Sequence, residues 1–247
     1  MKRIDGRGEM ELRRIRIKPG VMPNAQGSAE VRFGRTVVYF TAMMEAGVPP
    51  FLADSGKGWL TAEYGMLPGS CPKRKAREKQ KPDGRSTEIS RLIGRSLRSV
   101  CDFSALGERT IYIDCDVISA DGGTRTASIT GAFVALCLCV KKAMDDGVLE
   151  KSPVKSMIAA VSAGLVADTP LLDLCYLEDS SAQADMNMVA TPEGELAEIQ
   201  ISGEERTVSA REFATLVNMC KCGIREISDY QKEALKEAAE VIGAEHE

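Results

Sequence analysis

The residues of this sequence best suited to chemistry form a glycine-rich turn between an expected strand and an expected helix. Gly122 and Gly123 allow the backbone to turn sharply or to approach a ligand closely. Thr124, Arg125 and Thr126 follow directly and supply donors at the start of the helix. Because a helix N-terminus carries free amides and partial positive charge, and arginine adds a planar cation, the turn predicts a site for an oxyanion, most naturally phosphate.

An ordinary strand-to-helix turn with Arg125 in solvent would show the same local pattern, since Asp-Gly-Gly turns are common. The stretch matches neither the G-x-G-x-x-G dinucleotide motif nor the G-x-x-x-x-G-K-[ST] motif of P-loop proteins. The local pattern therefore leaves both interpretations open, and the rest of the chain has to decide between them.

A second candidate site lies between Glu178 and Asn187, where Asp179 and Asp185 stand six residues apart around an expected turn. Asp185 and Asn187 share one side of a strand, because side chains alternate along it. Paired carboxylates beside a phosphate site can hold magnesium or transfer a proton. The alternative interpretation is an Asp- and Ser-rich turn whose side chains cap the backbone.

A basic run from Lys73 to Lys81 contains six basic residues and one acidic residue. A solvated loop is the usual role of such a run. Here its charge opposes the formal net charge of −4 of the whole chain, as a contact with a phosphodiester backbone would require. The run contains no aromatic residue, so it does not imply base stacking.

The 247 residues otherwise have the composition of an ordinary globular protein. We expect no apolar run of membrane-spanning length and no signal peptide after Met1, which predicts a cytoplasmic protein with no membrane partner. Most of the eight cysteines lie in apolar periodic segments and are expected to pack in the core. The single histidine, His246, lies near the end of the chain, which argues against a histidine general base.

Apolar periodicity predicts an α+β fold with mixed sheets and packed helices, because strands and helices are grouped rather than strictly alternating. No change of composition separates two domains, so residues 1–247 are expected to form one domain. Strands are expected at about 14–18, 28–33, 36–43, 59–64, 110–118, 157–167, 171–178, 185–191 and 195–201, and helices at 86–100, 128–144, 210–222 and 226–242.

Five stretches of the sequence together resemble the ribonuclease PH family, and the resemblance runs almost from end to end. The stretches are Gly58–Pro68, Gly84–Ile89, Arg91–Arg98, Asp114–Ala132 and Glu178–Asn187. The resemblance implies a ribosomal-protein-S5-domain-2-like fold. It also implies a phosphate-dependent 3′→5′ exoribonuclease that trims the 3′ ends of tRNA precursors and typically assembles as a hexameric ring.

The same resemblance assigns roles to individual residues of this chain. The family's phosphate-binding residues correspond to Arg85, Gly123, Thr124 and Arg125. Its essential acidic pair corresponds to Asp179 and Asp185, which serve catalysis and are the candidate ligands of Mg²⁺. Its RNA-contacting basic loop corresponds to Lys73, Arg74, Lys75 and Arg77.

Two short segments depart from the family pattern. Lys18-Pro19-Gly20-Val21, together with Asp5-Gly6-Arg7, looks more like the catalytic subunit of the exosome, and Cys71-Pro72 stands where small hydroxyl residues are usual. The alternatives are therefore an archaeal-exosome-like ring subunit that acts with a partner subunit, a hydrolytic nuclease, and an inactive RNA-binding scaffold. A scaffold has no need of both arginines and both aspartates, and a hydrolytic nuclease normally displays more than two clustered carboxylates.

Overall fold

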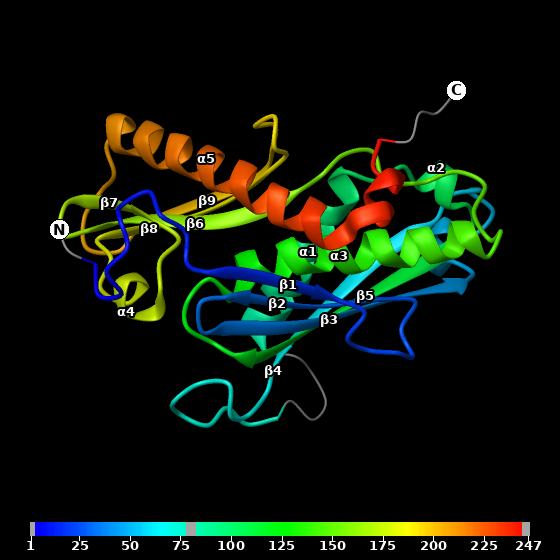
Figure 1. The fold of residues 1–247 in the computed structure, drawn as a ribbon, viewed down its shortest axis with the longest axis horizontal. Helices are drawn as coiled ribbons and strands as arrows, with labels where there is room; N and C mark the ends of the chain where they lie inside the picture. The colour runs from blue at the N-terminus through cyan, green and yellow to red at the C-terminus, as the bar shows by residue number, and fades with distance from the viewer. Residues whose placement is uncertain (1–2, 78–82, 244–247) are drawn as a thin grey trace.

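A mixed five-stranded sheet and an antiparallel four-stranded sheet form the framework of the protein (Figure 1). The computed structural model describes residues 3–77 and 83–243. In spatial order, the first sheet consists of β1 (Ile15–Pro19), β2 (Gly27–Phe33), β3 (Thr36–Ala46), β5 (Arg109–Ser119) and β4 (Trp59–Met66). The second sheet consists of β7 (Thr169–Leu172), β6 (Ala159–Val166), β8 (Ala184–Ala190) and β9 (Leu196–Gly203).

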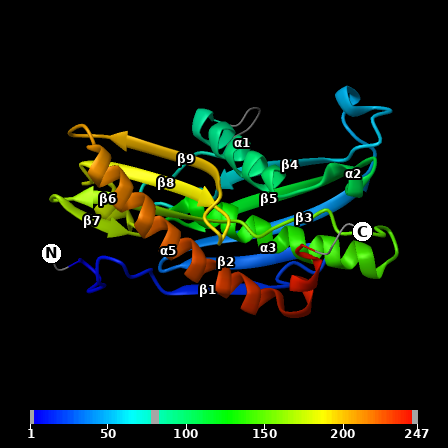
Figure 2. The same ribbon diagram turned by 90° about the horizontal axis from the view of Figure 1, so that it is seen from above.

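The helices cover the sheets and fill the space between the layers. They are α1 (Gly84–Ser99), α2 (Phe103–Leu106), α3 (Thr124–Asp145), α4 (Tyr176–Asp179) and α5 (Ala210–Leu235), with short 3₁₀ helices η1 (Pro50–Leu52) and η2 (Lys236–Val241). Seen from above, α5 runs across the second sheet while the strands of the first sheet lie side by side (Figure 2). The α+β expectation with mixed sheets is confirmed.

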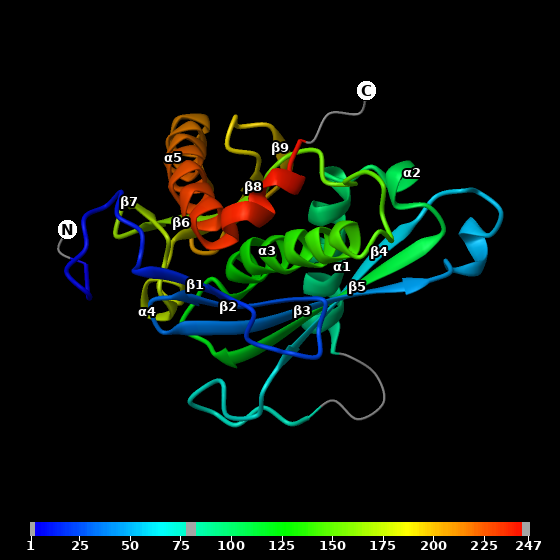
Figure 3. The same ribbon diagram turned by 45° about the vertical axis from the view of Figure 1, so that its right-hand side comes forward.

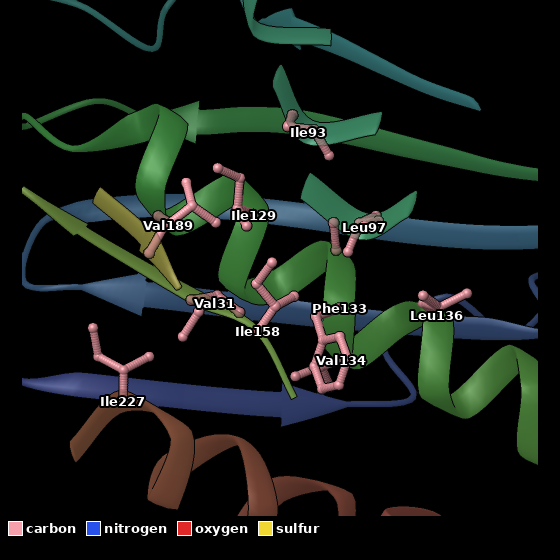
Figure 4. Close-up of a cluster of buried hydrophobic side chains, with 14 of the residues drawn as sticks. Val31, Ile93, Leu97, Ile129, Phe133, Val134, Leu136, Ile158, Val189 and Ile227 are labelled. Atoms are coloured by element: carbon pink, nitrogen blue, oxygen red, sulfur yellow. The ribbon is translucent and has the colours of Figure 1, made fainter. Parts of the chain in front are cut away.

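Helix α3 is the centre of the fold and lies between α5 and the five-stranded sheet (Figure 3). It contacts β2 and β3 of the first sheet and β6 of the second. Phe133 and Val134 of α3 are completely buried, in one apolar cluster with Val31 of β2 and Ile227 of α5 (Figure 4). Burial of this apolar surface is the main source of the stability that holds both sheets in place.

Helix α3 also corrects an expectation about apolar runs. By length and composition alone it could cross a membrane, although the sequence was expected to contain no such run. In the structure, 78% of its apolar window is buried inside the protein. Its apolar character on every side is therefore explained by packing against two sheets and α5.

Four expected elements or boundaries were wrong. Residues 171–178, expected as one strand, form the end of β7 followed by α4. The two expected C-terminal helices are one helix, α5, followed by η2. Helix α3 begins at Thr124 rather than near residue 128. Helix α1 begins at Gly84 rather than at residue 86, because Asp83 caps it: Asp83 Oδ1 accepts a hydrogen bond of 2.6 Å from the Ser86 amide.

Candidate active site

The glycine turn lies between the end of β5 and the start of α3, as the sequence predicts. Gly122 and Gly123 both adopt positive φ angles, of 76° and 63°. A Cβ atom on Gly122 would lie 2.7 Å from the carbonyl oxygen of Leu174 and 2.7 Å from the amide nitrogen of Tyr176. Glycine is required here because the turn touches the backbone at the start of α4.

Hydroxyl groups from two strands of the first sheet hold the turn in place. Thr36 Oγ1 donates to the Gly122 carbonyl at 2.7 Å and accepts from the Asp121 amide at 2.9 Å. The Tyr64 hydroxyl donates to Thr124 Oγ1 at 2.9 Å. The first turn of α3 therefore presents its amides from a loop that is fixed on the side facing the sheet.

The two aspartates come from separate elements of the second half of the chain. Asp179 is the last residue of α4, and Asp185 lies on β8 between β6 and β9. Desolvation by the surrounding protein raises the pKa of Asp179, although this side chain keeps solvent contact, and the charges of Arg125 and Arg85 oppose the rise. The fold thus brings both arginines within electrostatic reach of this carboxylate.

Asp185 stands in the same electrostatic environment. Desolvation raises its pKa, and the charges of Asp179 and Glu204 raise it further, while the charge of Arg125 opposes them. The pair of carboxylates is therefore costly to ionise completely, as is usual where a proton or a cation is handled.

The two arginines that act on Asp179 come from α1 and α3, and Arg125 also acts on Asp185. Arg85 is exposed in the first turn of α1, whereas the Arg125 side chain is only 16% exposed. Arg125 Nη1 donates to Gln200 Oε1 at 2.7 Å and lies 3.5 Å from Glu88 Oε1. Gln200 is neutral and Glu88 is half exposed, so neither contact strongly offsets the positive charge of Arg125. The guanidinium can therefore still attract an anion.

The basic loop follows β4 and lies against the start of α1. The side chains of Lys73, Arg74 and Arg77 are exposed. Lys75 Nζ instead pairs with Asp83 Oδ2 at 2.9 Å. The hydrogen bonds from the Ser86 backbone and from Lys75 lower the pKa of Asp83 to about 2. Lys75 therefore ties the loop to the helix that carries Arg85, and the remainder of the basic run, residues 78–81, lies outside the described residues.

Sequence reasoning missed the residues that assemble these segments. They are Arg3, Arg13, Asp173, Glu178, Gln200 and Glu204, each of which contacts or electrostatically influences a site segment. The acidic and basic members lie in charged or irregular stretches without periodicity. Burial in the structure marks four of them, Arg3, Arg13, Asp173 and Glu178, whereas Glu204 is exposed.

Glu178 holds α4 and therefore Asp179. Its two oxygens accept hydrogen bonds of 2.8 and 2.7 Å from Arg3, and Oε2 also accepts one of 3.0 Å from the Cys175 amide at the helix N-terminus. Desolvation raises the pKa of Glu178, but the hydrogen bonds and charge of Arg3 outweigh it, so the net pKa is lowered. The ionised form is the one that stabilises the fold.

Glu178→Gln is expected to lower the free energy of unfolding by roughly 3 kcal/mol, because it leaves Arg3 as a buried unpaired charge. Since the folded-state pKa of Glu178 is lowered, this stability is present above the unfolded-state pKa of about 4.3 and is lost as pH falls through the folded-state value. Urea denaturation at pH 7 and pH 4 measures the effect. The difference between wild type and variant should shrink at pH 4.

Glu212→Gln is the matched control for this prediction. Glu212 occupies the same capping position at the start of α5 and pairs with Arg206 at 2.7 Å, but the pair is partly exposed. Its replacement should have a much smaller effect. Equal losses in the two variants would show that helix capping, rather than the buried ion pair, accounts for the stability that Glu178 contributes.

Both halves of the chain match one protein family. Residues 11–142 match domain 1 of the 3′ exoribonuclease family, and residues 156–225 match domain 2 of that family. Ribonuclease PH of Syntrophomonas wolfei is 50% identical over 237 residues, which cover 95% of this chain and 99% of that protein. Ribonuclease PH of Solibacter usitatus is 48% identical over 236 residues, with the same coverage.

Solved structures share the fold. A chain of the Archaeoglobus fulgidus exosome with RNA bound to the active site superposes with a TM-score of 0.78 at 25% identity, covering 92% of each chain. Rice Rrp46 has a TM-score of 0.78 at 18% identity and covers 95% of this chain and all of its own. An archaeal exosome core chain has a TM-score of 0.75 at 25% identity, with 94% of this chain and 91% of its own covered.

The sequence identities distinguish ribonuclease PH from the exosome-like alternative. Similarity to ribonuclease PH is about twice that to the exosome chains and extends over nearly the whole of both proteins, so the exosome-like alternative is the less supported one. The expected ribonuclease PH fold is confirmed by the family domains and the structural neighbours. The chain therefore belongs to the 3′ exoribonuclease family, as a phosphorolytic 3′→5′ exoribonuclease of the ribonuclease PH type.

Proposed function

We propose that the glycine turn and the two aspartates form a single catalytic site, at which inorganic phosphate attacks the 3′-terminal phosphodiester of RNA. The observation that carries the proposal is the position of Arg125. It stands in the first turn of α3 beside the two glycines, and its charge acts on both Asp179 and Asp185. One cation thus links the phosphate-binding turn with the acidic pair.

In this reaction a phosphate oxygen attacks the phosphorus of the last phosphodiester, and the bond from that phosphorus to the 3′ oxygen of the preceding nucleotide breaks. The products are a nucleoside 5′-diphosphate and an RNA one nucleotide shorter, whose 3′ oxygen takes up a proton. Two polyanions have to meet, so Arg85, Arg125 and the amides at Gly123 and Thr124 would offset their repulsion and fix the direction of attack.

The acidic pair would serve the leaving oxygen. The raised pKa of Asp185 suits a group that delivers a proton to the 3′ oxygen. The pair also fits Mg²⁺, because that ion needs only one or two carboxylates when phosphate groups and water complete its octahedron, and it would relieve the repulsion between Asp179 and Asp185. When bound, Mg²⁺ would stabilise charge on the transferring phosphoryl group.

Degradation of a 3′-tailed RNA with and without inorganic phosphate tests this function. We expect nucleoside diphosphates as products and no degradation when phosphate is omitted. Nucleoside monophosphates released without phosphate would identify a hydrolytic nuclease instead. RNA binding without any shortening would identify a non-catalytic scaffold.

We further propose that precursor tRNA is a substrate and that the chain forms a homohexameric ring. Native mass spectrometry of the purified chain tests the assembly, with six copies as the expected result. A monomer or dimer that enlarges only after a second type of subunit is added would instead support an exosome-like ring with a partner.

The exposed part of the basic loop is proposed to contact the body of the RNA. Replacing Lys73, Arg74 and Arg77 by alanine should weaken binding of a precursor tRNA far more than binding of a short single-stranded oligonucleotide. The slope of log affinity against log salt should flatten by roughly 0.7–0.9 for each RNA phosphate that the variant no longer neutralises. Lys75 is left in place because its pairing with Asp83 supports the start of α1.

A control variant replaces three exposed basic residues elsewhere, Lys57, Arg211 and Lys232, and changes the net charge by the same amount. Fluorescence anisotropy with both RNAs at several salt concentrations provides the comparison. If the loop variant and the control weaken precursor binding equally, general charge rather than a loop contact accounts for the effect. An unchanged salt slope would also rule the loop out as an RNA contact.

A further inference from the structure

We propose that Arg13 is a positioning residue that couples the phosphate-binding turn to α4, and that it thereby sets the affinity for phosphate. The inference rests on the phosphate site proposed above. Arg13 precedes β1, far in sequence from either site segment, and its side chain is 4% exposed. Its guanidinium contacts both segments.

On one side, Arg13 binds the turn through backbone carbonyls. Arg13 Nη1 donates to the carbonyl oxygen of Asp121 at 2.6 Å and to that of Gly122 at 3.3 Å. The second carbonyl also accepts the hydrogen bond from Thr36. In the described part of the chain, the backbone amides of Gly123 and Thr124 donate no hydrogen bond.

These carbonyl contacts decide where the amides of the turn point. The C=O and N–H groups of a trans peptide point in opposite directions, and the described residues contain no cis peptide bond. Holding the carbonyls of Asp121 and Gly122 toward Arg13 therefore turns the amides of Gly122 and Gly123 away from it, which leaves donors available to an anion.

On the other side, Arg13 binds the segment that leads into α4. Arg13 Nε and Nη2 donate to Asp173 Oδ2 and Oδ1 at 3.0 and 2.7 Å, and the Arg13 amide donates to Asp173 Oδ2 at 2.8 Å. Asp173 has a φ of 54°, in the left-handed region, just before Cys175 caps α4. These three bonds hold the bend that α4, and with it Asp179, depends on.

The turn and the start of α4 are also in direct backbone contact at Gly122. A shift of the Arg13 guanidinium would therefore move the two segments relative to each other. Desolvation raises the pKa of Asp179, and the charge of Arg13 is one of those that oppose this rise. One buried cation therefore hydrogen-bonds both segments, the turn at Asp121 and Gly122 and the chain at Asp173.

If Arg13 only stabilised the fold, its replacement would not change the affinity for phosphate. Arg3 provides the comparison for such a structural role. Arg3 is equally buried and forms a bidentate pair with Glu178, but it contacts α4, the end of β7 and the Asp173 carbonyl without touching the turn. Loss of the bidentate ion pair of either arginine should lower the free energy of unfolding. Only loss of the Arg13 fork should change the affinity for phosphate.

The test compares Arg13→Lys with Arg3→Lys, each keeping the charge but losing the planar fork. With a short RNA at saturation, Arg13→Lys is expected to raise the KM for phosphate about tenfold or more, because a charge-assisted bond to the turn is removed. The KM for RNA should stay within about twofold, given that phosphate contacts in the RNA body are untouched. Arg3→Lys should leave the KM for phosphate unchanged.

Stabilisation by phosphate gives a readout that does not depend on turnover. A ligand that binds the folded state raises its apparent stability in proportion to the logarithm of its concentration above Kd. The rise in melting temperature on adding inorganic phosphate should be reduced in Arg13→Lys and kept in Arg3→Lys. An unchanged phosphate KM and an unchanged shift in Arg13→Lys would overturn the proposal.

Two further variants complete the test. If Arg13→Lys does not accumulate in folded form, Thr36→Val is used instead. This variant removes the hydrogen bond from Thr36 to the Gly122 carbonyl, and its phosphate KM is measured in the same way. A normal phosphate KM in Thr36→Val would then reject the orienting role of these carbonyls. Arg125→Ala separates this inference from the proposed function: if that variant binds phosphate normally, the phosphate site itself is misassigned, whatever Arg13 does.

Discussion

Arg125→Ala is expected to slow phosphorolysis at least about 100-fold while leaving the fold and RNA binding largely intact. A charge-assisted hydrogen bond to an anion contributes about 1.5–3 kcal/mol to binding, and a donor aimed at developing charge contributes more in the transition state. The Arg125 side chain is only 16% exposed and is held by Gln200, so the arginine is already oriented when phosphate arrives. Alanine removes both the charge and the orientation.

Arg95→Ala is the matched control for this variant. Arg95 also reaches β9, where it pairs with Glu198 at 3.1 Å, but it is 61% exposed and lies two turns further along α1 than Glu88. Rates measured over a range of phosphate concentrations should be nearly normal for this control. If Arg125→Ala stays within a few-fold of wild type at every phosphate concentration, the glycine turn does not bind the attacking phosphate.

Asp185→Asn is expected to be inactive both in RNA degradation and in the reverse addition of nucleotides from nucleoside diphosphates. The two directions share one transition state, so a group that serves it is needed in both. An amide cannot deliver the proton of a carboxylic acid and is a poor ligand for Mg²⁺. We expect a loss of at least about 100-fold, within the range that general acid–base catalysis contributes.

The same variant should be at least as stable as the wild type at pH 7. The folded-state pKa of Asp185 is raised, so its stabilising contribution belongs to the protonated form and is lost as pH rises through that pKa. Above it, the ionised carboxylate is held near Asp179 and Glu204 at a cost that asparagine removes. Thermal unfolding of wild type and variant at pH 5 and pH 7 measures this difference, which should be larger at pH 7.

Asp116→Asn is the matched control for the acidic pair. Asp116 lies on β5, and desolvation and the charge of Asp114 raise its pKa in a comparable way. It should keep normal activity in both directions. An Asp185→Asn enzyme as active as this control would reject both the proton-donor role and the metal-ligand role of Asp185.

The pH dependence of the wild-type rate separates those two roles. A proton donor has to be protonated, so the rate would fall as pH rises through the raised pKa of Asp185. A metal ligand has to be ionised, so the rate would fall as pH drops through the same value. Any residual rate of the Asp185→Asn variant should lack the corresponding dependence on pH in either case.

Local sequence determined the elements of the site and the residues that they carry. Alternation along β5, two glycines and an apolar helical repeat specify a strand, a turn and a helix within residues 109–145. That order places Thr124 and Arg125 between the glycines and the helix, but only the structure shows that the helix begins at Thr124 and includes both residues. The acidic turn at Asp179 and Asp185 and the basic loop were found in the same way, from residue type and spacing.

Only the tertiary structure decided how these pieces meet. A strand was expected at 171–178, where Leu171 and Leu172 begin an apolar stretch, yet the chain bends at Asp173 because Arg13, 160 residues away, binds its carboxylate there. Arg125 and Gln200 are 75 residues apart, and Arg3 and Glu178 are 175 apart. Periodicity records which side of an element is buried, but it does not record which buried charge will face which partner. That pairing arises when the two sheets pack around α3, and it brings the glycine turn against the start of α4, the helix that ends at Asp179.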